Sequence, residues 1–138
     1  MAASELTIST PGRGLHEITG RVERVVADSG VRDGLCTIFI RHTSASLIIQ
    51  ENADPSARRD LEAWLDRLVP EGDPIYTHTA EGSDDMPSHV KAALTQTSLS
   101  IPILRGRLAL GTWQGIFLWE HRRDPHQRRV VVSVLGQT

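Results

Sequence analysis

Short runs of apolar residues between polar ones predict that much of this chain forms β-strands. Runs that alternate, or that are rich in Val, Ile, Thr and aromatic residues, are typical of strands and too short for helices. Pro102 lies within one such run and suggests an edge position or a bulge, because proline cannot donate to a sheet ladder. The predicted strands are residues 5–9, 35–41, 46–50, 98–104, 108–110, 115–120 and 129–135.

Three other segments show helical spacing. The first follows Thr19, a residue suited to a helix N-cap, and has valines at 22, 25 and 26 before Gly30, which is suited to a helix end. The second begins at Asp54-Pro55 and the third at Asp85-Met86-Pro87, where a carboxylate precedes a proline near the first turn. The predicted apolar faces are Leu61, Trp64, Leu65 and Leu68 in the second helix and Val90, Ala93 and Leu94 in the third.

The predicted strands gather at the end of the chain instead of alternating with helices. This order favours an α+β fold with a largely antiparallel sheet over a doubly wound parallel sheet. Neither an internal repeat nor a Pro/Gly/Ser-rich linker divides the chain, and 138 residues is near the usual size of one domain. The sequence therefore predicts a single domain over residues 1–138 with two or three helices.

Composition and charge narrow the class of protein. The chain is 39% hydrophobic, as in folded globular proteins. Its net charge is −2, whereas a nucleic-acid-binding domain usually carries a positive charge concentrated on one face. We interpret Arg122-Arg123 and Arg128-Arg129 as solvated strand ends. One cysteine cannot form an internal disulfide, and neither a signal-peptide pattern nor a membrane-length apolar run is found. We expect a cytoplasmic protein with neither nucleic acid nor membrane as a partner.

The first polar motif, His-Thr-Ser-Ala-Ser at residues 42–46, places three hydroxyls within four residues. Thr43, Ser44 and Ser46 would suit an oxyanion or phosphate, and the alternative is that they only form a turn. If His42 extends the preceding strand, its ring lies at the rim of the core. For Asp54, which follows shortly afterwards, we favour a capping role alone.

The second motif, residues 76–91, concentrates carboxylates and two histidines. Asp85 and His89 are four residues apart, so they share one face if the helix begins near Asp85. A histidine beside a carboxylate suits a metal ligand or a general base held in one tautomer. The alternative, equally weighted on these residues alone, is a capping carboxylate with an exposed His89.

The third motif is Gly-Thr-Trp-Gln-Gly at residues 111–115, followed by a strand that ends in Trp119-Glu120-His121-Arg122. Its glycines suggest close approach to a ligand or another subunit, and His121 lies at a strand end, where site residues are common. For Trp113, Phe117 and Trp119 we prefer core or interface packing. No histidine or cysteine spacing matches a strong metal signature.

Taken together, the motifs resemble those of the YjbQ family, in the family's order and over nearly the whole chain. The resemblance implies a compact β-sandwich with helices on one side, assembled as a homotrimer with Trp113 and the glycines near the subunit contact. It also implies weak thiamine-phosphate synthase activity, which joins hydroxymethylpyrimidine pyrophosphate to thiazole phosphate and releases pyrophosphate. The matching segments are residues 42–47, 51–52, 54–55, 81–82, 84–89, 111–116 and 120–122.

These motifs lead to a hypothesis for the site. A pyrophosphate leaving group requires neutralisation by a divalent ion or by basic groups, so we expect a small phosphorylated ligand and a zinc or magnesium ion. The alternatives are a metal-dependent phosphoester hydrolase and a binding protein without turnover. The predicted residues are His42, Glu51, Asp85 and His89 for catalysis, Thr43, Ser44, Ser46, Asn52, Gln114 and Arg122 for ligand binding, and His78, His89 and His121 for the metal.

Overall fold

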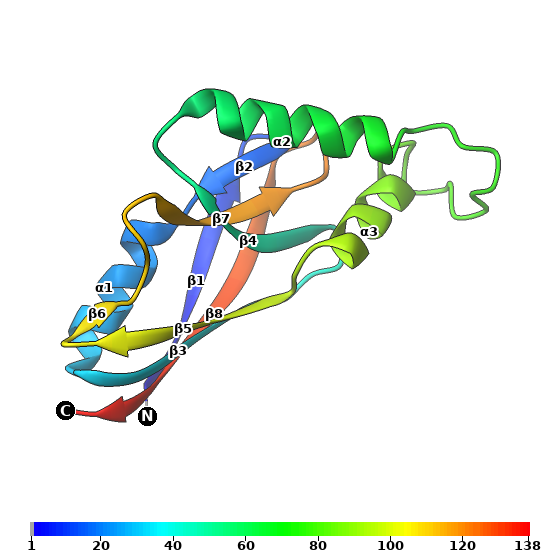
Figure 1. Ribbon diagram of the computed structural model, residues 1–138. Coiled ribbons are helices and arrows are strands. Elements are labelled where there is room, and N and C mark those ends of the chain that lie inside the picture. The colour runs from blue at the N-terminus through cyan, green and yellow to red at the C-terminus, as the bar shows by residue number, and fades with distance from the viewer. Residues whose placement is uncertain (1) are drawn as a thin grey trace.

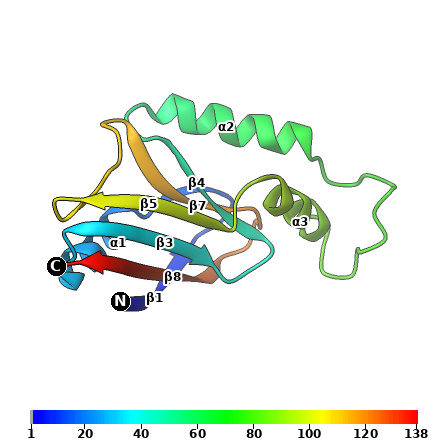
Figure 2. The ribbon, with the colours of Figure 1, turned by 60° about the horizontal axis from the view of Figure 1, so that its bottom comes forward.

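The computed structural model describes residues 2–138, and its strands form two antiparallel sheets. One sheet has the strand order β1-β8-β3-β5-β6 and the other has the order β2-β7-β4 (Figures 1 and 2). The elements are β1 (Ala2–Thr10), β2 (Gly14–Glu17), α1 (Thr19–Ser29), β3 (Asp33–Ile40), β4 (Ala45–Glu51), α2 (Pro55–Leu68), α3 (Asp85–Leu94), β5 (Ser98–Leu104), β6 (Arg107–Leu108), β7 (Gln114–Glu120) and β8 (His126–Gln137).

The main core lies between the two sheets and α1. On β3 the inward side chains are Cys36, Ile38 and Ile40, at the alternate positions expected of a strand with one buried face. They share one apolar cluster with Leu47 of β4 and Leu118 of β7, so side chains of both sheets meet in it. This confirms the predicted α+β fold with antiparallel strands and a sandwich-like core.

A second, smaller core explains why β7 is apolar at almost every position. Phe117 and Trp119 project from β7 away from the main core and pack with Leu65 and Val69 at the end of α2. The small sheet is therefore covered on both faces, and a strand covered on both faces loses the alternation of apolar and polar residues. Figure 1 shows α2 lying along this sheet.

Two local predictions at the start of the chain were wrong. The strand β2 (Gly14–Glu17) was missed, because four residues that include a histidine give no clear alternation. Thr19 is the first residue of α1, and Ile18 occupies the N-cap. The Thr19 hydroxyl instead donates to Glu17 Oε2 at 2.8 Å and accepts from the Ile116 N–H at 2.8 Å, which ties α1 to β7.

The predicted starts of α2 and α3 are correct, but the predicted apolar faces hold only in part. Asp54 caps α2 and accepts from the Ser56 N–H at 2.9 Å. Leu65 is buried, whereas Trp64 and Leu68 are each 53% exposed. In α3 the predicted face holds only at Val90, which packs against the smaller core, because Ala93 and Leu94 are exposed and polar groups turn inward. The buried residues of α3 are Asp85, Pro87, Ser88 and Lys91.

Gly20 inside α1 and Gly30 directly after it provide a matched test of the backbone. Gly30 ends the helix with a φ of 71°, and nothing lies within 4 Å of a Cβ added there. We expect Gly30→Ala to lower the free energy of unfolding by about 1 kcal/mol, because the left-handed conformation is unfavourable for alanine. Gly20→Ala, also in open space but inside the helix, should raise it by about 0.5–1 kcal/mol. Urea denaturation checks both, and equal effects would contradict this account.

Among residues 2–138, no helix is long and apolar enough to cross a membrane.

Candidate functional site

Two histidines and one aspartate converge at the start of α3. His78 Nε2 lies 2.8 Å from Asp85 Oδ2, and His89 Nε2 lies 3.1 Å from the same oxygen. One potential ligand atom from each of the three residues lies within 4.8 Å of the other two. We call His78, Asp85 and His89 the His-Asp-His cluster.

The chain brings these residues together by two local devices. Asp85 and His89 are one helical turn apart on α3, so their side chains emerge on the same face. His78 comes from the segment between α2 and α3, which projects beyond the sheets in both ribbon views (Figures 1 and 2). Asp85 is buried, His89 is partly buried and His78 is exposed, so the cluster opens to solvent on the His78 side.

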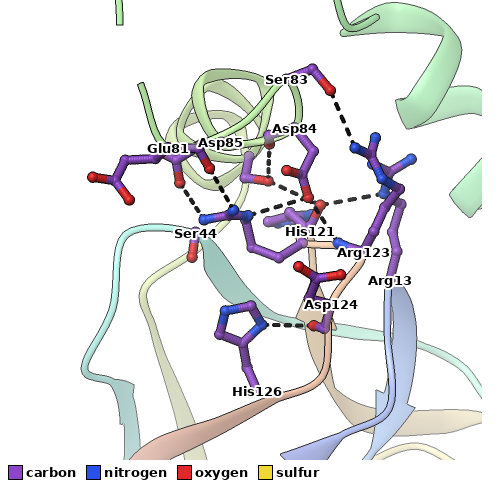
Figure 3. Close-up of polar contacts among 12 residues, drawn as sticks. Arg13, Ser44, Glu81, Ser83, Asp84, Asp85, His121, Arg123, Asp124 and His126 are labelled. Carbon is purple, nitrogen blue, oxygen red and sulfur yellow. Dashed lines mark hydrogen bonds and ion pairs between the residues drawn. The ribbon is translucent and has the colours of Figure 1, made fainter. Parts of the chain in front are cut away.

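Arg122 holds the aspartate of the cluster in place. Its Nη1 donates to Asp85 Oδ1 at 2.6 Å and its Nε donates to Asp84 Oδ2 at 3.2 Å. Figure 3 shows Asp84 and Asp85 at the start of α3, pointing toward the segment after β7 that carries His121 and Arg123. Burial raises the pKa of Asp85, but the hydrogen bond from His78 and the charges of His89 and Arg122 outweigh it and lower the pKa overall. Asp85 is therefore an ionised carboxylate at neutral pH.

The hydrogen bonds of His89 favour a proton or a metal cation between its Nε2 and the Asp85 carboxylate. His89 Nδ1 lies 2.9 Å from the carbonyl oxygen of Thr43, so Nδ1 must carry a proton and donate it. In a neutral ring, Nε2 then presents a lone pair to the Asp85 carboxylate at 3.1 Å. Two acceptors facing each other repel unless a proton or a metal cation lies between them. A histidine whose other nitrogen is fixed by a backbone carbonyl is also the usual arrangement of a metal ligand.

The donor set indicates which ion would fit. Two imidazole nitrogens and one carboxylate oxygen suit zinc and other first-row transition ions. Magnesium prefers oxygen ligands alone. Of the two ions expected from the sequence, these residues therefore fit zinc better than magnesium.

His121, predicted as a metal ligand, is not brought to the His-Asp-His cluster. Its ring is buried beneath Trp119, and Nε2 is bonded to the hydroxyl of Ser46 at 2.9 Å. Its Nδ1 is buried without a hydrogen-bond partner among the described residues. The cluster has Asp85 where the sequence hypothesis placed His121, because the strand end turns the His121 side chain into the interior.

The burial of His121 predicts a pH dependence of stability. Burial, with a further contribution from the charge of Lys91, lowers the pKa of His121 from 6.5 to about 3. Between these values the unfolded chain binds a proton that the folded chain excludes, so the free energy of unfolding falls with falling pH by about 1.4 kcal/mol per unit. We expect His121→Gln to lose this part of the slope in urea denaturation between about pH 6 and pH 4. Equal slopes would contradict a neutral, buried His121.

The residues of the first motif divide between a cleft and the interior. His42 and Thr43 line a cleft of about 450 Å³ together with His89 and Gln96, so this cleft adjoins the His-Asp-His cluster. Ser44 and Ser46 are both buried, with their hydroxyls bonded to protein groups. The expected hydroxyl cradle for a phosphate is therefore reduced to Thr43.

A buried ion pair lies beneath this motif, and sequence analysis missed it. Arg128 donates through Nε to Glu120 Oε1 at 2.7 Å, and Thr10 donates to the same oxygen at 2.6 Å. Both charged side chains are almost fully buried. The available signal was the spacing of Arg128, which lies two residues before Val130 and hence on the inward face of β8. The interpretation of Arg128 as a solvated residue was wrong.

Glu51, Asn52 and Gln114 lie at the far end of the small sheet. Glu51 pairs with Gln114, whereas Ala45 at the other end of β4 pairs with Glu120. Six residues of extended strand separate these ends by roughly 20 Å. Asn52 donates to Glu17 Oε2 at 3.0 Å beside a second, polar cleft of about 530 Å³. Within one chain, the predicted site residues are therefore split between two places.

Comparison with known proteins places this chain in a family. The family model for the UPF0047 protein YjbQ-like family matches residues 4–137. The chain belongs to the YjbQ family. Among YjbQ relatives, a UPF0047 protein of Synechocystis sp. is 58% identical over 132 residues, which cover 96% of this chain and 90% of the relative. YjbQ of Escherichia coli O157:H7 is 44% identical over 133 residues, 96% of each chain.

Solved structures of YjbQ-like proteins share the architecture. A conserved protein of the YjbQ/UPF0047 family from Clostridium acetobutylicum aligns with a TM-score of 0.84 at 39% identity, over 98% of this chain and 100% of that one. A hypothetical protein from Aeropyrum pernix aligns with a TM-score of 0.90 at 29% identity, over 99% and 100%. The names of these relatives and structures state no reaction.

Proposed function

We propose that this YjbQ protein is a metal-dependent enzyme that acts on a small phosphorylated molecule. The observation that carries the proposal is the His-Asp-His cluster, where the fixed proton on His89 Nδ1 leaves Nε2 directed at an ionised carboxylate. A divalent ion bound there would neutralise charge on a phosphate or pyrophosphate group. The adjoining cleft of about 450 Å³ is large enough for a small ligand.

The described residues support roles for the protein groups. His78 and His89 supply nitrogens and Asp85 supplies an oxygen, while Arg122 keeps the carboxylate oriented through Oδ1. Thr43 presents its carbonyl to His89 and lines the cleft. Glu51, at the far end of the small sheet, has no part in this site within one chain.

Transfer with release of pyrophosphate is the reaction we favour. Arg122 pairs with the carboxylates of Asp84 and Asp85, which keeps Asp85 oriented to hold a cation beside the cleft. Charge neutralisation of a leaving group is the main demand of such a transfer. A metal ion would serve a phosphoester hydrolase in the same way. The family resemblance leads us to propose a transferase of the thiamine-phosphate synthase type over a phosphoester hydrolase or a binding protein without turnover.

We also propose that the chain assembles as a homotrimer. Large apolar side chains are exposed on the isolated chain, including Trp113 at 63% and Trp64 at 53%. Tryptophans of this exposure are enriched at protein interfaces. Light scattering of the purified protein should give about three times the chain mass of 15.2 kDa. A mass equal to one chain would reject the trimer.

An activity assay tests the proposed function. Hydroxymethylpyrimidine pyrophosphate and thiazole phosphate are incubated with protein stripped of metal and with protein supplied with zinc. We expect thiamine phosphate and pyrophosphate to form only with the metal, and His89→Ala to abolish the reaction. His16→Ala is the control, because His16 is bonded to the Gly12 carbonyl away from the cluster. Phosphate release without a joined product would favour the hydrolase, and no turnover with intact metal binding would favour the binding protein.

A further inference from the structure

His42 is bonded in a way that fixes which of its nitrogens carries the proton. The N–H of Ser44 points at His42 Nδ1 over 3.1 Å. A backbone N–H can only donate, so Nδ1 must accept and cannot hold a proton in this arrangement. The proton of the neutral ring therefore lies on Nε2.

The hydroxyl of Ser44 reinforces this tautomer. Arg128 Nη2 donates to Ser44 Oγ at 3.0 Å, and the same oxygen lies 3.0 Å from His42 Nδ1. Arginine has no acceptor, so the serine accepts from Arg128 and its own proton is free to point at Nδ1. Arg128 is in turn fixed by the buried carboxylate of Glu120. A chain of oriented hydrogen bonds thus runs from the interior to His42.

The same contacts oppose a second proton on the ring. An imidazolium would direct an Nδ1–H at the Ser44 N–H, with the positive charge of Arg128 behind it. Desolvation and then the charge of Arg128 lower the pKa of His42, which agrees with this geometry. With Nδ1 occupied and Nε2 protonated, the ring has no free lone pair with which to act as a general base.

We propose that His42 meets the ligand in the adjoining cleft as a neutral imidazole that donates a hydrogen bond through Nε2–H, and that Ser44 and Arg128 are positioning residues that set this tautomer. The ligand atom that such a donor recognises is an anionic or carbonyl oxygen, such as a phosphate oxygen. His42 would then stabilise negative charge without changing its own protonation, a role that neutral histidines fill in enzymes. The inference rests on the cleft beside the His-Asp-His cluster as the ligand site.

Nitrogen NMR of the full-length protein labelled with ¹⁵N-histidine tests the tautomer directly. Long-range ¹H–¹⁵N spectra should show a pyridine-type nitrogen at His42 Nδ1 and a pyrrole-type nitrogen at Nε2, with the signals assigned by their loss in His42→Gln. Ser44→Ala keeps the backbone N–H but removes the hydroxyl and its link to Arg128, so the other tautomer should become measurably more populated than in wild type. Thr43→Ala, next to it in sequence, should leave the spectrum unchanged. A protonated Nδ1 in the wild type would overturn the proposal, and an unchanged spectrum in Ser44→Ala would remove Ser44 from it.

Binding of inorganic pyrophosphate by zinc-loaded protein tests the donor role. The side-chain amide of glutamine can place an N–H near the position of Nε2, whereas leucine has no donor. We expect His42→Leu to weaken binding by about tenfold or more, as for a hydrogen bond to a charged group, and His42→Gln to stay within about threefold of wild type. Equal losses in both variants would overturn the donor role. Failure of zinc to bind would reject the proposed function but leave the tautomer measurement valid.

Discussion

Replacing Arg128 with alanine should lower the free energy of unfolding by about 3–5 kcal/mol, the usual cost of leaving a buried charge without its partner. Arg128 and Glu120 have relative side-chain exposures of 1% and 0%. Burial raises the pKa of Glu120, but hydrogen bonds from Arg128 and Thr10 outweigh it and keep the carboxyl ionised. Removing the Arg128 guanidinium therefore removes two of the hydrogen bonds that the Glu120 carboxylate accepts. Urea denaturation at neutral pH measures the loss.

Two controls separate the lost charge pair from lost packing. Arg129→Ala removes the neighbouring arginine, whose partner Glu5 is at the surface, and should leave the unfolding curve close to that of wild type. Arg128→Met combined with Glu120→Leu removes both charges and keeps most of the volume, so it should recover much of the stability. A double variant as unstable as Arg128→Ala would show that packing, and not the unpaired Glu120, causes the loss.

The strands and helix starts were predictable from sequence because their causes are local. On β3 and β8 the alternation of residues reports directly which side is buried. Asp54 followed by Pro55 begins α2 because both residues act on the first turn of the same helix. Each of these signals lies within one element, so it can be interpreted without knowing which other elements pack against it.

Other features depend on partners that are distant in sequence. The side chains of Asp85 and Lys91 are buried because Asp85 pairs with Arg122 and Lys91 pairs with Asp66. Both partners lie outside α3, so no pattern within that helix predicts the burial. In the candidate site, the spacing of Asp85 and His89 correctly predicted that they share a helix face. The sequence hypothesis also named His78 as a metal residue, and the segment between α2 and α3 brings it to Asp85 and His89. The separation of His121 from them was not predictable, because it is set by the turn at the end of β7.

Replacing Asp85 with asparagine should weaken zinc binding by at least about a hundredfold. Asp85 is the one anionic residue of the His-Asp-His cluster, and its Oδ2 faces both histidine nitrogens. Even residues that only orient a metal ligand typically change affinity by about 10–100-fold, so loss of the charged ligand should exceed that range. Competition with a zinc chelator measures the affinity, and circular dichroism confirms that the variant is folded.

Asp73→Asn is the matched control for the charge change. Asp73 lies in the same segment as His78, and its carboxylate accepts from the nearby Ile75 N–H at 3.0 Å. It should keep the zinc affinity of the wild type. Equal affinity of Asp85→Asn and wild type would show that the ion, if bound, lies elsewhere.

The metal content of protein purified without a histidine tag tests the central claim most directly. Wild-type protein and His89→Ala are incubated with the same concentration of zinc, and unbound zinc is then removed. The zinc that remains is measured per protein chain. We predict close to one zinc per chain in the wild type and almost none in His89→Ala, because one nitrogen ligand and its anchor to the Thr43 carbonyl are removed together. Equal, negligible metal in both proteins would contradict a metal site at His78, Asp85 and His89.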